Sequence, residues 1–255
     1  MPSEWMAPEV YEILTHGINQ DLSFYEQLSH KQNGPILDLG AGLGRISAPL
    51  LHNGHSVVLL EHNPHMCSEL SRRFSALPKE VQQRVWILKQ DMTTYAALDV
   101  NKLEFGHPDT LPQQFAIVIL GLRTIHLFSE SERRQIVSLA KNLLKPGGVL
   151  SIHYSDLKQA VPTPSWTLVA EHPLESGTIE VEECFFHHLS SQQFHLRHRI
   201  WQSNGRGQHV GSWRVAHDLY AVDLQNLLSE LSDIGFTHID NPPLHGTESF
   251  IIARV

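Results

Sequence analysis

Glycines between an apolar run and the following amphipathic segment could bind a nucleotide-like ligand. Residues 36–44 read Ile-Leu-Asp-Leu-Gly-Ala-Gly-Leu-Gly. Glycine lets the backbone turn sharply and lets a ligand approach closely, and open α/β sheets bind nucleotides at the carboxyl ends of their strands. A Walker A loop needs Gly-Lys-Ser/Thr at its end, but Arg45 follows Gly44. The dinucleotide fingerprint G-x-G-x-x-G needs glycine at position 45. The loop therefore indicates a D-x-G-x-G-x-G site from Asp38 to Gly44.

Two acidic residues follow the next apolar runs at comparable positions. Glu61 ends the run 56–60, and a carboxylate there can accept hydrogen bonds from both hydroxyls of a ribose. Asp91 follows the run 85–88, where it can accept from an adenine amino group while Met92 packs on the ring. Carboxyl ends of parallel strands meet at one sheet edge, so these groups should lie together. The alternative is that both acids are ordinary solvated strand ends.

The apolar pattern places these residues on an alternating strand and helix framework. Buried strands are predicted at 35–39, 56–60, 85–88, 115–120 and 149–154. Helices between them are marked by Asn63-Pro64 as N-cap and first helical position and by a Ser129-x-x-Glu132 capping box. Residues 96–114 are expected to form a loop with a short helix. Repeated strand–helix units imply a parallel sheet with right-handed crossovers.

The segment 157–221 changes character and predicts an antiparallel insertion. Strands are expected at 178–187 and 194–201 around a turn at 190–193, with a third strand at 209–221. Asp223 then caps a helix that ends at Gly235, and two final strands at 236–240 and 249–254 are expected to form a hairpin.

With its glycine loop, its strand-end acids and its Lys-Pro-Gly-Gly turn at 145–148, the chain resembles the small-molecule branch of the class I S-adenosylmethionine (SAM) methyltransferases. The resemblance implies an α/β fold: a Rossmann-like, seven-stranded, mostly parallel sheet with helices on both faces and an antiparallel insertion over the active site. It also implies one domain over 1–255, with an N-terminal helical segment 1–33, a core of 34–156 and 222–255, and a lid at 157–221. One departure is Ala116, where family members usually carry aspartate.

The resemblance implies SAM as the cofactor. The residues expected to bind it are Asp38, Gly40, Ala41, Gly42, Gly44, Arg45, Glu61, His62, Asp91, Met92 and Leu120.

Residues that could face the acceptor come from strand ends, the N-terminal helix and the insertion. Because the sulfonium of SAM is already activated, the protein mainly aligns donor and acceptor and excludes water; a base is needed only when the nucleophile holds a proton. The candidate catalytic residues are His126, His153, Tyr154 and His217. The candidate acceptor-binding residues are Tyr11, Arg123, which could hold a carboxylate, and Trp213.

The histidines do not predict a metal site. His187, His188, His195 and His198 are close in sequence, but zinc needs three or four converging ligands. Neighbouring residues on a strand point to opposite faces, so His187 and His188 diverge, as do His195 and His198. No metal is expected.

Composition excludes several partners. The 255 residues carry a net charge of −8 without basic runs, which argues against nucleic acid and anionic membranes as main partners. No apolar window approaches the length of a membrane span, and two isolated cysteines suit a reducing cytoplasm.

The function expected is methyl transfer to nitrogen or oxygen of a small-molecule acceptor by in-line displacement. The alternatives are a SAM-binding enzyme of the same fold with another reaction, such as cyclisation, and an NAD-linked oxidoreductase. The sequence leaves the oligomeric state open, with a dimer among the options.

Overall fold

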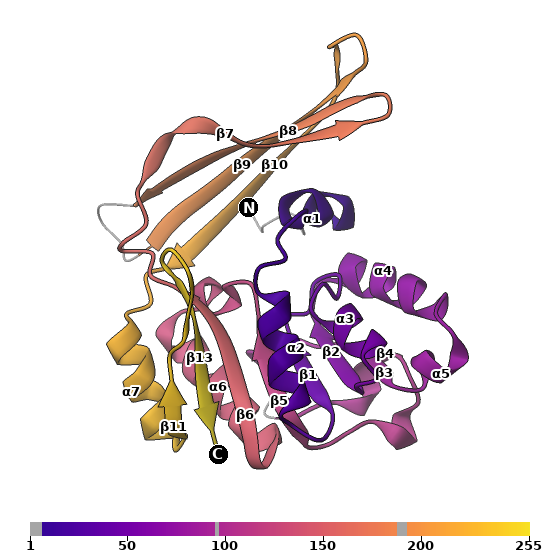
Figure 1. The fold of residues 1–255 in the computed structure, drawn as a ribbon, viewed down its shortest axis with the longest axis vertical. Helices are drawn as coiled ribbons and strands as arrows, with labels where there is room; N and C mark the ends of the chain where they lie inside the picture. Colours follow the sequence, from indigo (N-terminus) through magenta and orange to yellow (C-terminus); the bar gives the residue numbers. More distant parts are fainter. Residues whose placement is uncertain (1–6, 95–96, 188–192) are drawn as a thin grey trace. The chain divides into compact units, whose positions relative to one another are not determined.

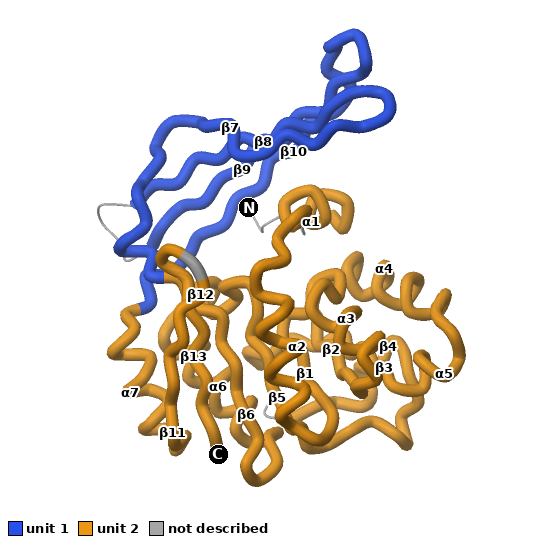
Figure 2. Tube along the Cα trace, in the orientation of Figure 1, with its two compact units in different colours: residues 1–6, 156–222 blue, residues 7–155, 223–255 orange. Residues whose placement is uncertain are grey.

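The computed structural model describes residues 7–94, 97–187 and 193–255. The chain divides into two compact units (Figure 2). One comprises residues 7–155 and 223–255, and the other comprises residues 156–222. The insertion leaves the larger unit directly after its strand β6 and returns directly before its helix α7 (Figure 1).

The larger unit is built on a mixed sheet whose described strands run in the order β11-β13-β6-β5-β1-β2-β3-β4, with β12 paired to β13. The strands β1, β2, β3, β5 and β6 are parallel, while β13 runs antiparallel to β6. Their bounds are β1 Ile36–Leu39, β2 Val57–Glu61, β3 Val85–Lys89, β4 Leu103–Phe105, β5 Phe115–Leu120, β6 Leu144–Ser155, β11 Thr237–Asp240, β12 Pro243–His245 and β13 Glu248–Arg254.

Helices pack on both faces of this sheet, as its continuous apolar strands require. One core layer joins α2, α3 and α4 to the side chains of Ile36, Leu59, Ile87 and Ile119. On the other face, α6 contacts β5, β6 and α7. The helices are α1 Pro8–Thr15, α2 Leu22–His30, α3 Ser47–His52, α4 Pro64–Ser75, α5 Lys79–Gln82, α6 Glu130–Leu143 and α7 Leu224–Ile234.

Local side-chain chemistry explains where these helices begin and end. The Asn63 side chain accepts hydrogen bonds from the backbone N–H groups of His65 and Met66 at the start of α4. Ser129 and Glu132 form the reciprocal capping box of α6. At the end of α7, Gly235 takes the left-handed conformation with φ 95°.

The sheet has more strands than expected. Seven of its strands, β1, β2, β3, β5, β6, β11 and β13, correspond to the seven expected, but β4 and β12 add short antiparallel pairings to β3 and β13. The segment 96–114, expected to be a loop with a short helix, contains β4 between the 3₁₀ turns Val100–Lys102 and Pro108–Thr110. A three-residue strand is too short to show a period of two.

The smaller unit is an antiparallel sheet in the order β10-β9-β8-β7. Its strands are β7 Thr163–Leu174, β8 Gly177–His187, β9 Gln193–Asn204 and β10 His209–Tyr220. The expectation of three strands was wrong, because β7 also belongs to the sheet. β7 is an edge strand, largely exposed, with Trp166, Leu168 and Val169 open to solvent, so it lacks the in–out alternation by which strands are recognised. The turn expected at 190–193 lies mostly outside the described residues.

Membrane-spanning helices are absent from the described residues, since none of their helices combines the necessary length and apolarity.

Candidate functional site

The glycine loop lies directly after β1, in a conformation that needs its glycines. Gly40, Gly42 and Gly44 all have positive φ, at 74°, 58° and 75°, which residues with a Cβ rarely adopt. The backbone N–H of Gly40 donates to the carbonyl of Leu60 at 2.8 Å. A Cβ at Gly40 would come within 3.2 Å of Met92 and Thr124. The loop is therefore held between the ends of β1, β2, β3 and β5.

Glu61 at the end of β2 is buried and is not a solvated strand end. One carboxylate oxygen accepts from the backbone N–H of Gly42 at 2.9 Å, and the other accepts from those of His62 and Asn63 at 2.8 Å each. Burial alone would raise the pKa of Glu61, but these hydrogen bonds outweigh it and the pKa is lowered. Glu61 is thus an ionised acceptor that also fixes the glycine loop. Beside it, the pKa of His62 is raised by its hydrogen bond to the Glu61 carboxylate.

Asp38 and Arg45 lie on either side of the loop. Asp38 accepts from the Ser47 hydroxyl at 2.6 Å, and burial raises its pKa to about 6 despite that bond and the nearby Arg45. Arg45 forms a two-pronged ion pair with Asp21, at 2.7 and 2.6 Å. It also donates to the carbonyl of Ile18 at 2.9 Å. Its Nε is buried without a hydrogen-bond partner among the described residues.

Asp91 and Met92 follow β3 next to the loop. One oxygen of Asp91 accepts from the backbone N–H and the hydroxyl of Thr93, at 2.8 and 2.7 Å, and Asp91 is partly exposed. Met92 is buried at 6% exposure. Met92 therefore offers an apolar surface and Asp91 a carboxylate at this end of the site.

Tyr11 of α1 packs on the glycine loop. A Cβ at Gly42 would lie 2.7 Å from a ring carbon and from the hydroxyl oxygen of Tyr11. Burial raises the pKa of Tyr11 to about 12, so its hydroxyl keeps its proton. Glu12 in the same helix pairs with Arg73 of α4 at 2.6 Å, which helps to hold α1 over the loop.

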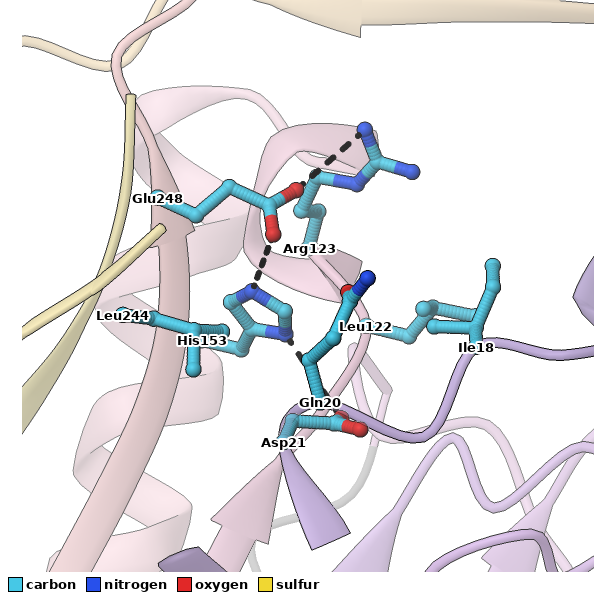
Figure 3. A pocket seen from close by; sticks show the side chains of 8 residues that line it. All are labelled: Ile18, Gln20, Asp21, Leu122, Arg123, His153, Leu244 and Glu248. Atoms are coloured by element: carbon cyan, nitrogen blue, oxygen red, sulfur yellow. Dashed lines mark ion pairs between the residues drawn. The ribbon is translucent and has the colours of Figure 1, made fainter. Parts of the chain in front are cut away.

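A cavity of about 100 Å³ lies at the same edge of the sheet (Figure 3). It is lined by Ile18, Gln20, Asp21, Leu122, Arg123, His153, Leu244 and Glu248. His153 of β6 stands between two carboxylates: its Nε2 is 3.4 Å from Glu248, and its Nδ1 is 3.9 Å from Asp21. His153 is only 2% exposed, and neither ring nitrogen has a hydrogen-bond partner among the described residues. Arg123 is 3.6 Å from Glu248 on the opposite side of that carboxylate.

The backbone beside the cavity is strained. Leu122 and Arg123 are consecutive non-glycine residues with positive φ, at 44° and 60°. Such conformations cluster at functional sites, where the surrounding structure imposes them. Thr124 follows them and borders Gly40, so the cavity and the glycine loop are neighbours.

Three other candidates lie deeper in the larger unit. His126 is fully buried, and its Nε2 accepts from the backbone N–H of Ser155 at 3.2 Å. The Tyr154 ring is 5.4 Å from that of His126 and is also buried. Leu120 at the end of β5 is fully buried. His126 and Tyr154 therefore join the segment after β5 to the end of β6.

Trp213 and His217 belong to the smaller unit. Both lie on β10, four residues apart and so on the same face, opposite Ile200 and Leu196 of β9. Arg214 lies on the other face. His195 and His198 point to opposite faces of β9, where His195 contacts Asp218 at 2.7 Å and His198 faces Glu183 at 3.3 Å. Within the described residues, no three His, Cys, Asp or Glu side chains converge as metal ligands would; His188 lies outside those residues.

Asp21 and Glu248 line the cavity but are not among the site residues expected from the sequence. Asp21 precedes α2, and Glu248 begins β13, a strand that pairs with β6 so that Glu248 lies opposite Ser155. Asp21 begins the segment 21–25, which follows the family pattern, whereas Glu248 has no neighbouring motif. The only available signal was that the last strand lies beside β6, which brings its first residues to the end of the sheet where His153 lies.

Comparisons with known proteins agree with this arrangement. The family model described as a methyltransferase domain matches residues 36–148. The ribosomal RNA small subunit methyltransferase A of Mycolicibacterium vanbaalenii is 24% identical over 115 residues, which cover 45% of this chain and 36% of that protein. The chain thus matches little more than a third of the length of this curated relative.

Solved structures share the fold over nearly the whole chain. SAM-bound CalS10, an amino pentose methyltransferase from Micromonospora echinaspora, is 16% identical with a TM-score of 0.74, covering 96% of both chains. The sugar N-methyltransferase KedS8 from Streptoalloteichus is 15% identical with a TM-score of 0.74, covering 96% of this chain and 92% of that one. The resemblance to class I SAM-dependent methyltransferases is therefore confirmed in the fold and in residues 36–148, which match the methyltransferase domain model.

Proposed function

We propose that this protein is a SAM-dependent methyltransferase that acts on nitrogen or oxygen of a small-molecule acceptor. The observation that carries the proposal is the grouping of the glycine loop, Glu61 and Asp91 at one sheet edge. There a buried, ionised acceptor lies 2.9 Å from the Gly42 amide, and an apolar side chain, Met92, lies beside Gly40.

The residues present fit this cofactor. Glu61 accepts a single backbone donor at one of its oxygens, so that oxygen retains capacity for a ribose hydroxyl. The second oxygen of Asp91, which makes no hydrogen bond within the described residues, suits an adenine amino group. The buried Nε of Arg45 lacks a partner there and suits the amino-acid carboxylate of the cofactor. Ala41, Gly44, His62 and Leu120 complete the proposed surroundings.

In this scheme the cofactor supplies a methyl group on a positively charged sulfur, and the protein's residues bind and orient. Glu61 holds the ribose and the glycine loop together. Asp38, with its pKa near 6, is mostly ionised at neutral pH and can attract the cofactor's amino group. Tyr11 of α1 packs against Gly42 of the glycine loop, and its protonated hydroxyl can donate a hydrogen bond at neutral pH.

The acceptor is proposed to lie in the cavity between Asp21, Arg123, His153 and Glu248. Its position next to Thr124 and the glycine loop supports this, because transfer needs donor and acceptor about 3–3.5 Å apart. His153 is the proposed proton acceptor. His126 and Tyr154 are proposed to position the end of β6, and Trp213 and His217 to contact the acceptor from the insertion.

A small molecule fits better than RNA as the acceptor. The solved neighbours named above act on amino pentoses and other sugars by their descriptions, and the chain carries a net charge of −8, which opposes a polyanion. A location in the cytoplasm is proposed from composition alone, and no oligomeric state is proposed.

Native mass spectrometry of the purified protein, followed by calorimetry with SAM, tests the cofactor. A mass increase that matches SAM or S-adenosylhomocysteine, and binding at micromolar concentration, are expected. Co-purification of NAD would instead favour the oxidoreductase alternative. SAM bound and consumed without release of S-adenosylhomocysteine would favour another reaction, such as cyclisation.

A substitution at Gly42 tests whether the glycine loop binds the cofactor, but Tyr11 packs on this residue and complicates the result. Gly42→Val would strain a residue with φ 58° and place its Cβ 2.7 Å from Tyr11, so it displaces α1 as well as the ligand. Pairing Gly42→Val with Tyr11→Ala separates the two effects: binding of SAM by the double variant would argue against the loop as the cofactor site.

A further inference from the structure

The hydroxyl of Tyr25 on α2 is buried and makes no hydrogen bond within the described residues. The whole residue is only 1% exposed. Its ring packs edge-on against those of Phe24 and Phe250, with ring centroids 5.5 Å apart in both pairs. This packing fixes the direction of the hydroxyl. A buried polar group without a partner is rare in native proteins, and one explanation is a ligand that supplies the partner.

The hydroxyl lies at the sheet edge where the cofactor is proposed to bind. A Cβ at Gly121, directly after β5, would be 3.6 Å from the hydroxyl oxygen, and β5 pairs with β1, which leads into the glycine loop. Burial and the carboxylates of Asp21 and Asp38 raise the pKa of Tyr25 well above its ordinary value, although Arg45 lowers it. The hydroxyl therefore keeps its proton and can donate among these charged groups.

Arg45 presents a second buried donor at the same edge. Its two terminal nitrogens donate to Asp21 and to the carbonyl of Ile18, whereas its Nε has no hydrogen-bond partner in the part of the chain that the structure describes. The Nε–H and the Tyr25 O–H are both donors, so a group that satisfies both must be an acceptor. A carboxylate has two oxygens and no donor, and can accept from two separate groups at once.

We propose that the Tyr25 hydroxyl donates a hydrogen bond to the amino-acid carboxylate of the bound cofactor, as the second donor to this group beside the Arg45 Nε. The inference rests on the proposed methyltransferase function and deepens it, because it adds Tyr25 to the cofactor site. The amino-acid end of SAM carries both charges, and Asp38 is proposed to attract its amino group. Tyr25 and Arg45 supply the donors that the carboxylate needs.

Two other partners for the hydroxyl fit less well. The amino group of the cofactor could donate to the Tyr25 oxygen, but it would leave the Nε–H of Arg45 unsatisfied and would add a second cation near the guanidinium. A buried water could bridge the two donors, as buried waters do for polar groups that lack protein partners. In that case removal of the hydroxyl would leave cofactor affinity unchanged.

Two ligands that differ only in the carboxylate test the proposal: S-adenosylhomocysteine and its decarboxylated analogue, S-adenosyl-3-thiopropylamine. Calorimetry measures both affinities for the wild-type chain and for Tyr25→Phe, which loses the hydroxyl and keeps the ring. The variant is expected to bind S-adenosylhomocysteine at least tenfold more weakly, the scale of one hydrogen bond to a charged group. Its affinity for the analogue should stay within twofold of the wild type. Unchanged affinity for S-adenosylhomocysteine, or an equal loss for both ligands, would overturn the proposal.

The melting temperature of the ligand-free protein gives a readout that does not depend on the ligand. Because the Tyr25 hydroxyl makes no hydrogen bond to any described residue, Tyr25→Phe should melt at the wild-type temperature or above it. A lower melting temperature would show that the hydroxyl serves the fold, and would also overturn the proposal.

Ser71→Ala is the matched control. The Ser71 hydroxyl on α4 is another buried hydroxyl without a hydrogen bond among the described residues, but it lies outside the proposed site. Its removal should leave the affinities for both ligands unchanged. A selective loss of S-adenosylhomocysteine binding in Ser71→Ala as well would show that the effect is not specific to Tyr25.

The same experiment keeps this inference separate from the proposed function. If the wild type binds S-adenosylhomocysteine and Tyr25→Phe binds it equally well, the methyltransferase assignment stands and the role of Tyr25 fails. If the wild type binds neither ligand, the methyltransferase assignment fails and takes the inference with it.

Discussion

At the scale of single residues, Glu61 fixes the backbone around it in addition to the ribose-binding role proposed for it. It is the acceptor expected for a ribose, and it also anchors Gly42 and the first residues after β2. Because a neutral amide would turn one N–H group toward these backbone donors, Glu61→Gln should weaken SAM binding by about 1.5–3 kcal/mol, the range for a hydrogen bond to a charged group. Calorimetry with SAM measures this.

The matched control is Glu69→Gln on α4. Glu69 is an ionised carboxylate whose pKa is lowered to about 2 by its hydrogen bonds to Arg72 and Arg73, and it lies outside the proposed site. The affinity of the Glu69→Gln variant for SAM should equal that of the wild-type protein. Wild-type affinity in Glu61→Gln as well would remove Glu61 from the cofactor site.

The ionised carboxylate of Asp38 lowers the stability of the native state, because it is buried. Its native pKa of about 6 exceeds its ordinary value of 3.8, so the native state favours the protonated form. The penalty is absent below about pH 3.8, grows up to about pH 6 and is complete above it. Asp38→Asn should therefore stabilise the protein at pH 7.5, by at most about 3 kcal/mol for a shift of this size, with a smaller gain at pH 5. Urea unfolding at both pH values measures the difference.

The same substitution should weaken SAM binding, since the carboxylate is proposed to attract a cationic amino group. A residue whose removal raises stability and lowers affinity is typical of a binding site. A stability gain of equal size at both pH values would show that the Asp38 charge is not its cause.

His153 tests the chemistry of the acceptor side. His153→Gln keeps a polar side chain but cannot take up a proton, so release of S-adenosylhomocysteine should fall at least tenfold. The affinity for SAM, held by other residues, should change less than threefold. If turnover were preserved, His153 would only line the cavity.

At the scale of elements, the contact between α6 and α7 contains a buried ion pair. Arg133 and Glu230 are 3.1 Å apart, with side chains 8% and 6% exposed. Glu230→Ala would leave the Arg133 charge buried without its partner, and should lower the free energy of unfolding by about 3–5 kcal/mol.

The next pair along these helices supplies the control. Arg134 and Asp233 are 3.9 Å apart and both largely exposed, so Asp233→Ala should cost less than about 1 kcal/mol. Denaturant unfolding of both variants measures the contrast. Similar losses would mean that water reaches the Arg133 pair.

Elements with a strong local signal could be predicted from sequence. The cap residues Asn63, Ser129 and Asp223 each accept backbone hydrogen bonds where expected, because a cap depends on neighbours in sequence. β7 could not be predicted, since as an exposed edge strand it shows neither alternation nor a buried run. Its place in the sheet depends on pairing with β8, which is a property of tertiary structure.

At the scale of the whole molecule, the two halves of the site differ in how predictable they were. The glycine loop, Glu61 and Asp91 each follow a strand of a parallel sheet, so topology alone brings them together. The cavity instead combines Asp21, Arg123, His153 and Glu248 from segments up to the last strand. Nothing local marks Glu248, and the proximity of Asp21 and Glu248 to His153 depends on tertiary structure, such as the pairing of β13 with β6.

The last prediction concerns the insertion 156–222, which we expect to act as a lid over the bound acceptor. It leaves the core directly after β6, the strand that carries His153, so its attachment is at the acceptor end of the proposed site. Trp213 and His217 share one face of its sheet, and Arg214 occupies the other. We predict that the face with Trp213 and His217 contacts the acceptor and excludes water, and that the face with Arg214 does not.

Trp213→Leu and His217→Gln should therefore lower turnover or raise the acceptor KM at least tenfold, while SAM affinity stays within twofold of the wild type. Arg214→Gln, between them in sequence but on the opposite face, should leave both unchanged. SAM affinity, melting temperature and S-adenosylhomocysteine release are measured on the same preparations. If Trp213 and His217 only pack the sheet or join two copies of the chain, their loss would lower the melting temperature or change the oligomeric state, with turnover per folded molecule preserved. That outcome would contradict the lid, because a surface that closes over the acceptor cannot be altered without changing the rate at which the acceptor reacts.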